Sequence, residues 1–333
     1  MDADSHIAIA GAGSIGCFVG GVLAEAGRNV SMLGRGSLAE RVQQDGVTIS
    51  DIDGWTSHLP PARTGMTTDP AMLAEADIIL VCVKSGATEE MARAIATHAK
   101  REAIIVSLQN GVTNADKLRA ILPDHDVRAG MVAFNVVQLP DGRFHKATSG
   151  EIMIEAGAPS LAPLLDSPRL RFVDAGDMSA ILWGKLLINL NNALNALANI
   201  PIVEQLADPR WRRLFAAAQA EGLAALKAAR IKPKAATPIP PRLMPIMLRL
   251  PTPLFRRIFG RSMKIDPNAR SSMWEDLSKG RLTEIDELQG AVVALAEAHG
   301  LDAPVNRRIH AAIRAAEAAG SGPPGLRPAD LAP

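Results

Sequence analysis

The chain has 333 residues, a formal net charge of +1 and 47% hydrophobic residues, which predicts a soluble globular protein of one large or two ordinary domains. The near-neutral charge excludes a general attraction to nucleic acid or membrane, and 3% aromatic residues without tyrosine argue against a base-stacking surface. The two cysteines, Cys17 and Cys82, form no disulfide framework and fit a reducing cytoplasm. We expect neither a signal peptide nor a membrane span, because a basic leader and a long apolar run are both missing.

Short apolar strands alternate with helical patterns through the first half of the chain. We expect strands at residues 6–10, 29–33, 77–83, 103–108, 127–133 and 150–155, and helices at 14–26, 88–99 and 115–121. Buried strands that alternate with helices indicate an α/β domain with a doubly wound, Rossmann-type parallel sheet.

Strand signals end near Gly176, and an all-α region follows. We expect helices at 179–199, 211–229, 271–299 and 305–319. The predicted domains are therefore residues 1–175 and 176–320, with a proline-rich, basic insertion at 232–266 and a disordered tail at 321–333. The basic residues of the insertion are Lys232, Lys234, Arg242, Arg249, Arg256, Arg257, Arg261 and Lys264.

A glycine motif follows the first strand and opens the first helix. Gly11, Gly13 and Gly16 have the GxGxxG spacing, with Ala12, Ser14 and Ile15 between them. In this context the motif is typical of a dinucleotide site, where the helix N-terminus faces the pyrophosphate. An ordinary glycine-rich turn is the alternative.

The end of the second strand favours NADP over NAD. An NAD enzyme usually has an acidic residue there, whereas this chain has Arg35, which can bind a 2′-phosphate. Lys84, after the strand at 77–83, could add a second positive charge at the same edge. A solvated arginine and a surface lysine are the alternatives.

Asn110 follows the strand at 103–108, at the end of the sheet where ligands bind in such folds. Because glycine comes next, a plain turn explains the asparagine equally well.

The segment ILWGKLLINLNNALNAL, residues 181–197, predicts a helix with two distinct faces. At about 100° per residue, one stripe contains Lys185, Asn189, Asn192, Ala196 and Asn199. Another stripe contains Leu186, Leu190, Leu194 and Leu197. Amides aligned with one lysine suit a polar cleft, and a buried amide network between helices is the alternative. Asn191 and Asn195 lie off the polar stripe and need a different explanation.

A second polar stretch is RSSMWEDLSKGRLTEIDELQG, residues 270–290. On a helix, Ser272, Asp276 and Lys279 share a face, and Glu284 follows. These side chains are consistent with an exposed surface or with the lining of a cleft.

The chain contains three motifs in this order: the glycine motif GAGSIG, then WGKLLIN, then SSMWEDLSKGRLTEIDELQG. This order is typical of the ketopantoate reductase family, which the chain resembles over about residues 6–315. HGLDAPVN near the end also fits. The resemblance implies a Rossmann domain followed by a helical domain of the 6-phosphogluconate dehydrogenase C-terminal kind. It implies reduction of 2-dehydropantoate, a small 2-oxo acid, to pantoate with NADPH, on the route to pantothenate and coenzyme A.

The resemblance also implies roles for single residues of the substrate site. Lys185 matches the catalytic lysine, which donates a proton, and Glu284 matches the glutamate beside the substrate hydroxyl. Ser272 matches a serine near the substrate carboxylate, Asn189 the first asparagine of the lysine helix, and Asn110 an asparagine near nicotinamide and substrate. Arg35 and Lys84 match the basic residues that read the 2′-phosphate. No residue is assigned to a metal, and a homodimer stays open.

Two departures from the family affect the substrate. Members commonly have a second asparagine where this chain has Ala193, with Asn192 beside it as a substitute substrate contact. The insertion 232–266 is also long for the family and could be a lid, an interface or neither. Two other hypotheses therefore stand: a reductase of another branched or aromatic 2-oxo acid, and an NADP(H)-binding sensor without catalysis.

Overall fold

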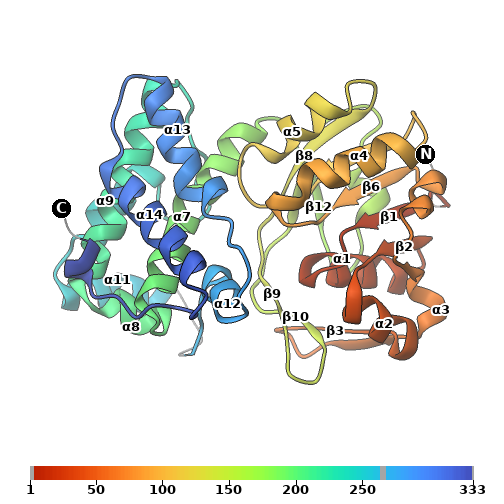
Figure 1. Cartoon of the computed structure of the whole chain (residues 1–333), viewed down its shortest axis with the longest axis horizontal. Coiled ribbons are helices and arrows are strands. Elements are labelled where there is room, and N and C mark those ends of the chain that lie inside the picture. Colours follow the sequence, from red (N-terminus) through yellow and green to blue (C-terminus); the bar gives the residue numbers. More distant parts are fainter. Residues whose placement is uncertain (1–3, 263–267, 332–333) are drawn as a thin grey trace. The chain divides into compact units, whose positions relative to one another are not determined.

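The computed structural model describes residues 4–262 and 268–331, which form two compact units that divide between Met178 and Ser179 (Figure 1). Lys264 and Asp266 of the predicted insertion lie outside the described residues. The division falls at the start of α7 (Met178–Ala198), slightly later than the boundary expected near Ala175. No helix of the described part is long and apolar enough to cross a membrane.

The first unit is built on an eight-stranded sheet of order β12-β11-β8-β7-β6-β1-β2-β5. Its strands are β1 (Ile7–Ala10), β2 (Val30–Leu33), β5 (Met66–Thr67), β6 (Ile78–Val81), β7 (Ile104–Ser107), β8 (Asp126–Val132), β11 (Ile152–Glu155) and β12 (Phe172–Ala175). All neighbours are parallel except β8 and β11. Because the strand order runs in opposite directions from β1, the switch point where open α/β sheets bind ligands lies at β1 and β6. The predicted Rossmann-type sheet is confirmed.

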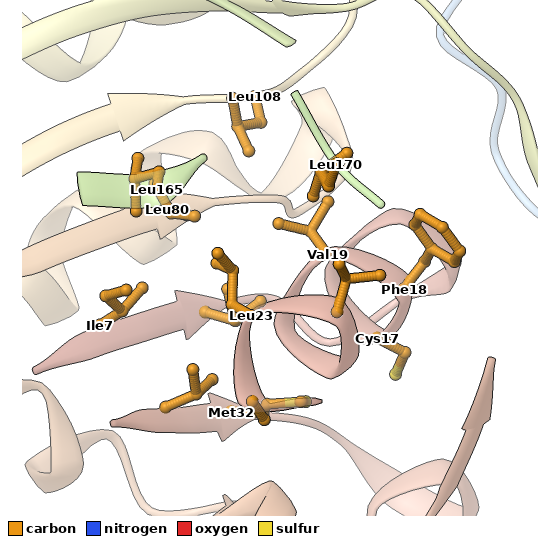
Figure 2. Packing of buried hydrophobic residues seen from close by; sticks show 14 of the residues in the cluster. Ile7, Cys17, Phe18, Val19, Leu23, Met32, Leu80, Leu108, Leu165 and Leu170 are labelled. Carbon is orange, nitrogen blue, oxygen red and sulfur yellow. The ribbon is translucent and has the colours of Figure 1, made fainter. Parts of the chain in front are cut away.

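Both faces of this sheet are covered, which explains its apolar strands. Alternate residues of β1 and β6 point to opposite sides: Ile9 and Leu80 pack with α1 (Ser14–Glu25), whereas Ala8 and Ile79 pack with α4 (Thr88–His98) and α5 (Asn114–Ile121). Figure 2 shows Val19 and Leu23 of α1 among the aliphatic side chains of the first cluster. Burial on both faces requires the unbroken apolar runs that predict the strands.

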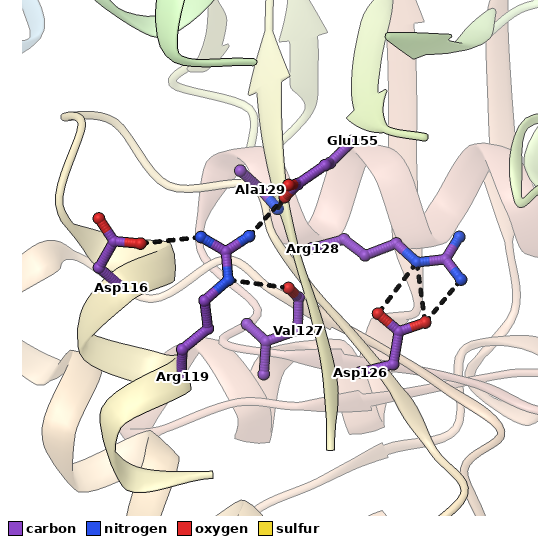
Figure 3. Close-up of polar contacts among 7 residues, drawn as sticks. All are labelled: Asp116, Arg119, Asp126, Val127, Arg128, Ala129 and Glu155. Atoms are coloured by element: carbon purple, nitrogen blue, oxygen red, sulfur yellow. Dashed lines mark hydrogen bonds and ion pairs between the residues drawn. The ribbon is translucent and has the colours of Figure 1, made fainter. Parts of the chain in front are cut away.

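The antiparallel pair at β8 and β11 is braced by Arg119 of α5 (Figure 3). Its guanidinium donates to the Val127 carbonyl at 3.2 Å and to the carboxylates of Asp116 and Glu155. Glu155 also accepts the backbone N–H of Ala129 at 2.9 Å. These bonds pair backbone groups of β8 beyond the end of its ladder with β11. Backbone groups at this end of the antiparallel pair therefore keep hydrogen-bond partners.

A second sheet, of order β4-β3-β10-β9, has no counterpart in the sequence-based prediction. It comprises β3 (Val47–Asp51), β4 (Thr56–Leu59), β9 (Val136–Gln138) and β10 (Phe144–Lys146). β4 reads TSHL and β9 has three half-buried residues, so neither has the apolar run that marks a strand. β5 and β12 are missed for the same reason, whereas the expected strands and helices of the first half are present within a residue or two at each end. The short helices of this unit are α2 (Gly36–Asp45), α3 (Pro61–Thr64), η1 (Pro70–Glu75), η2 (Ser85–Ala87) and α6 (Ala162–Leu165).

The second unit consists of helices. After α7 come α8 (Ile202–Ala207), α9 (Pro209–Ala228), η3 (Pro241–Leu243), α10 (Met244–Leu248), α11 (Thr252–Ser262), α12 (Ser272–Ser278), η4 (Asp286–Gly290), α13 (Ala291–Ala298), α14 (Pro304–Ala319) and η5 (Pro328–Leu331). The single helix expected at 271–299 is wrong, because α12 ends at Ser278 and Lys279 is its C-cap, followed by Gly280, which has the positive φ typical of a helix C-terminus. The chain resumes as η4, a π-helical turn that continues into α13.

The described part of the insertion, residues 232–262, packs on α9 through Arg212. This guanidinium is fully buried and donates to the carbonyls of Leu248 and Leu250 at 3.0 and 2.9 Å. It also lies 4.3 Å from the ring centre of Phe255 in α11. One buried cation therefore ties α9 to both α10 and α11.

The expected disorder of the tail is wrong for residues 321–331. The Leu326 N–H donates to the Leu197 carbonyl of α7 at 2.8 Å, and Leu331 is 1% exposed. The tail is rich in proline and glycine, but these two residues dock it on the helices.

Candidate active site

The glycine turn after β1 has the geometry that a dinucleotide requires. Gly11 has φ +108°, and a β-carbon there would lie 2.7 Å from the Val83 nitrogen. A β-carbon at Gly16 would lie 2.4 Å from the Gly11 carbonyl oxygen, so only glycine lets α1 approach the turn this closely. A β-carbon at Gly13 would meet nothing within 4 Å, which leaves open space beside the N-terminus of α1. Two glycines thus shape the turn, and the third leaves its backbone accessible, as pyrophosphate binding needs.

The remaining residues of the motif hold this turn in place. The N–H groups of Gly11 and Ala12 both donate to the Leu33 carbonyl at the end of β2, at 3.2 and 2.8 Å. Ala12 is buried, whereas Ser14 and Ile15 are half-buried in the first turn of α1. The residues present therefore fit a dinucleotide at the switch point.

A small cavity lies at the carboxyl end of β2. It encloses about 150 Å³ and is lined by Leu33, Gly34, Arg35, Thr68, Pro70, Glu90, Met91 and Ala94. Arg35 is the N-cap residue before α2 and donates to the Glu90 carboxylate of α4 at 2.8 Å. Lys84 is exposed before η2, after β6. The sequence analysis singled out Arg35 and Lys84 but missed Glu90, because no local signal connects α4 with the end of β2.

Asn110 lies after β7 and is held by a buried polar network. Its carbonyl accepts from the Asn114 amide at 2.6 Å and from the Ser85 hydroxyl at 3.5 Å. Thr88 donates to Asn114 and accepts from Gln109, at 2.9 and 2.7 Å. Ser85, Thr88, Gln109 and Asn114 are all buried, so Asn110 lies in a fixed turn rather than a loose one.

In the second unit, α7 has the two faces that the sequence predicts. Leu186, Leu190, Leu194 and Leu197 are each at most 2% exposed. Lys185, Asn189 and Asn192 are half-buried on the other side, but Ala196 is fully buried and ends the polar stripe earlier than expected.

Gly184, directly before Lys185, is in close contact with the insertion. A β-carbon at Gly184 would lie 1.9 Å from the Lys234 carbonyl oxygen. The Lys234 N–H donates to the Ala180 carbonyl at 2.8 Å. The insertion therefore crosses α7 beside the lysine, and glycine is the residue that permits this approach.

The Lys185 ammonium is destabilised by its surroundings. Burial lowers the pKa of Lys185 from 10.5 to about 8, while the Glu284 carboxylate raises that pKa. Glu284 lies in the turn before η4, which is fastened by the Thr283 N–H to Glu317 of α14 at 2.7 Å. A lysine with such a pKa exchanges its proton near neutral pH, as a general acid must.

The off-stripe asparagines form the buried amide network that the sequence analysis kept as an alternative. Asn191 and Asn195 both bond to Gln205 of α8, with the Asn191 side chain accepting from Gln205 at 3.0 Å. The side-chain amide oxygen of Asn195 accepts from the Ser271 N–H at 2.8 Å, and the Ser271 hydroxyl donates to the backbone carbonyl of Asn192 at 2.9 Å. Because Ser271 caps α12, the network sets where Ser272 begins that helix.

Ser272 itself is exposed, while Asp276, one turn later, is buried. The shared helical face expected for Ser272, Asp276 and Lys279 is therefore not uniform in exposure. Ala193 is fully buried, whereas Asn192 is half-buried on the lysine side of α7. Within the second unit, the structure brings together Lys185 and Glu284 in electrostatic contact, and it places Asn189 and Asn192 on the lysine face of α7.

A glycine turn at a Rossmann switch point, followed by a helical unit with a lysine of lowered pKa, defines a nicotinamide-dependent oxidoreductase. The family model described as ketopantoate reductase PanE/ApbA matches residues 7–159, and its C-terminal model matches residues 177–317. The chain belongs to the ketopantoate reductase family.

Similar proteins cover most of the chain. The 2-dehydropantoate 2-reductase of Halobacterium salinarum is 29% identical over 94% of this chain and 99% of its own length. The enzyme of the same name from Archaeoglobus fulgidus is 26% identical over 94% and 98%.

Solved structures share the whole fold. A PanE/ApbA family ketopantoate reductase from Ralstonia eutropha JMP134 has a TM-score of 0.82 and 28% identity, covering 95% of this chain and 99% of its own. A D-mandelate dehydrogenase, solved with NADH and anilino(oxo)acetate, has a TM-score of 0.78 and 18% identity over 95% and 99%, so it shares the fold alone.

Proposed function

We propose that this protein reduces 2-dehydropantoate to pantoate with NADPH, with Lys185 as the general acid. The observation that carries the proposal is the half-buried Lys185, whose pKa of about 8 is lowered by burial and raised by the nearby Glu284 carboxylate. The chain also matches a 2-dehydropantoate 2-reductase over 94% of its length.

The proposed role of Lys185 is to neutralise the oxygen of the reacting carbonyl. When bound, NADPH supplies the hydride that reduces the keto carbon. As the C=O double bond becomes a single bond, negative charge collects on the substrate oxygen. The Lys185 ammonium stabilises that charge and gives the oxygen a proton, which leaves a neutral lysine and a product alcohol. A pKa near 8 favours this transfer, because an ordinary lysine holds its proton more tightly.

The other residues orient the substrate in this proposal. Glu284 accepts a hydrogen bond from the distal hydroxyl of the substrate, and its negative charge raises the pKa of Lys185. Ser272 and Asn189 bind the substrate carboxylate and neighbouring oxygens, and Asn192 substitutes for the asparagine that is absent at Ala193. Asn110 positions the substrate against the nicotinamide, with its backbone held by Asn114.

NADPH is proposed over NADH because the end of β2 carries Arg35 and no carboxylate of its own. Exposed Lys84 adds positive charge after β6. A guanidinium binds a phosphate in a forked geometry, and a second cation strengthens the attraction.

A second candidate substrate is another branched or aromatic 2-oxo acid. The observation that favours it is Ala193, whose small side chain is fully buried where relatives commonly have an amide. The same cofactor and the same proton donor serve either substrate. A sensor without catalysis is less favoured, because it would have no use for a lysine of lowered pKa.

The test is oxidation of NADPH by the purified protein with a panel of 2-oxo acids. We expect the highest kcat/KM with 2-dehydropantoate. A higher kcat/KM with another branched or aromatic 2-oxo acid would favour the second candidate, and no turnover with any acid would favour the sensor.

A further inference from the structure

The Glu90 carboxylate lies in the cavity at the end of β2, against the residue that is proposed to read the cofactor's 2′-phosphate. Glu90 Oε1 is 2.8 Å from Arg35 Nη2, and both side chains line the same cavity of about 150 Å³. The two side chains are 67% and 65% exposed. An exposed ion pair contributes little to stability. The helix dipole favours a carboxylate in the first turn of α4, but Glu89 lies in the same turn, so that effect does not single out Glu90.

A carboxylate at this point has a direct chemical consequence. In NAD enzymes an acidic residue at the end of the second strand accepts a hydrogen bond from the ribose 2′-hydroxyl and repels a 2′-phosphate. Here β2 ends at Leu33 and continues into Gly34 and Arg35, so the strand itself supplies no carboxylate. Glu90 brings one to the same cavity from α4.

We propose that Glu90 sets the cofactor selectivity of this protein. It competes with the 2′-phosphate of NADPH for Arg35, and it accepts a hydrogen bond from the 2′-hydroxyl of NADH. The protein then binds both cofactors, and its preference for NADPH is weaker than Arg35 alone would produce. This inference rests on the proposed function, because it takes Arg35 as the phosphate-binding residue.

The neighbouring Glu89 provides a matched control. Glu89 is one residue away on α4, is 63% exposed and pairs at 2.9 Å with Arg93 of the same helix. It does not line the cavity. A Glu-to-Gln change at either position removes the same charge from the same helix, so only proximity to Arg35 distinguishes them.

The experiment measures the Kd of NADPH and NADH by fluorescence titration, without substrate, for the wild type, Glu90→Gln, Glu89→Gln and Arg35→Ala. We expect Glu90→Gln to bind NADPH about tenfold more tightly, because a like charge beside the phosphate is removed. The same variant should bind NADH about threefold more weakly, since a charged hydrogen-bond acceptor is lost. The gain for NADPH should shrink at high salt, which screens exposed charges. Glu89→Gln should change neither Kd.

Equal changes for both cofactors in Glu90→Gln, or no change, would overturn the role of Glu90. If Arg35→Ala weakens both cofactors equally, the NADPH part of the proposed function fails together with this inference. A protein that shows the expected binding pattern but reduces no 2-oxo acid would contradict the proposed reaction and leave the selectivity role intact.

Discussion

The carbonyl oxygen of Lys234 lies so close to Gly184 that a β-carbon at position 184 would come within 1.9 Å of it. The insertion and the lysine helix α7 are therefore fitted to each other one residue before Lys185. This contact explains the glycine of the WGK motif, which helix propensity alone would disfavour.

Gly184→Ala should destabilise the protein, because the atom opposite the new methyl group is backbone and cannot turn aside. Overpacking of this kind costs about 1–3 kcal/mol, measured as a lower midpoint of chemical denaturation. We also expect a lower kcat, since α7 must shift beside Lys185. Gly176→Ala is the control, because a β-carbon there meets nothing within 4 Å. Equal stability of the two variants would contradict the fit between Lys234 and Gly184.

Lys185→Met should lower kcat by about 10²- to 10⁴-fold, the usual effect of losing a general acid. The same change should raise the melting temperature at neutral pH. The pKa of Lys185 is about 8 in the folded protein and 10.5 ordinarily, so folding is penalised below pH 8. The unfolded chain binds more protons between these values, and the penalty fades as pH rises toward 10.5. The gain in melting temperature should therefore shrink as pH rises. A fall in melting temperature at neutral pH would indicate that Lys185 has a structural role.

The pH profile of reduction should have a descending limb near pH 8. Lys185 acts in its ammonium form, and its pKa is about 8, so kcat/KM should fall as the lysine loses its proton. Because the Glu284 carboxylate raises this pKa, Glu284→Gln should move the limb to lower pH. A limb that stays in place in this variant would mean that another group titrates.

Asn114→Ala should weaken the turn that carries Asn110. It removes the bonds from Asn114 to the Asn110 carbonyl and to Ser85 and Thr88, all in a buried site. We expect a loss of about 1–3 kcal/mol in stability for the partners left unpaired. A lower kcat should accompany it. Asn114→Asp should lose at least as much stability, because it places a buried carboxylate oxygen against the Asn110 carbonyl oxygen. Asn29→Ala, at an exposed asparagine, serves as the control.

Arg212→Met should release the insertion from α9. The change leaves the buried carbonyls of Leu248 and Leu250 without their donor, and Phe255 without its stacked cation. Limited trypsin digestion should then cut first in the insertion, where wild type resists. Arg213→Met is the matched control, because Arg213 is the exposed neighbour. Equal protection of both variants would show that the insertion is held by other contacts.

Local patterns in the sequence predicted much of the secondary structure of this protein. The spacing of Gly11, Gly13 and Gly16 predicted the glycine turn, and Gly16 packs on Gly11 within it. The atoms that exclude a β-carbon at Gly11 belong to Cys82 and Val83, which follow β6 and are distant in sequence. The leucine face of α7 is buried as its periodicity requires. The prediction of one helix at 271–299 was wrong, because the positive φ of Gly280 interrupts the helix although the helical sequence pattern continues beyond it.

By itself, the sequence determined six of the eight strands of the main sheet, the dinucleotide turn and the polar stripe around Lys185. Apolar runs, helical periodicity and glycine spacing are patterns that act over a few residues. Only the tertiary structure decided which distant groups meet. It paired Arg35 with Glu90, joined Asn191 and Asn195 to Gln205, and laid Lys234 across Gly184. The second sheet likewise forms where two local hairpins, β3–β4 and β9–β10, meet through the pairing of β3 with the distant β10. The physical reason is that charge pairs, amide networks and close backbone contacts depend on distance in space, which no local pattern of residues encodes.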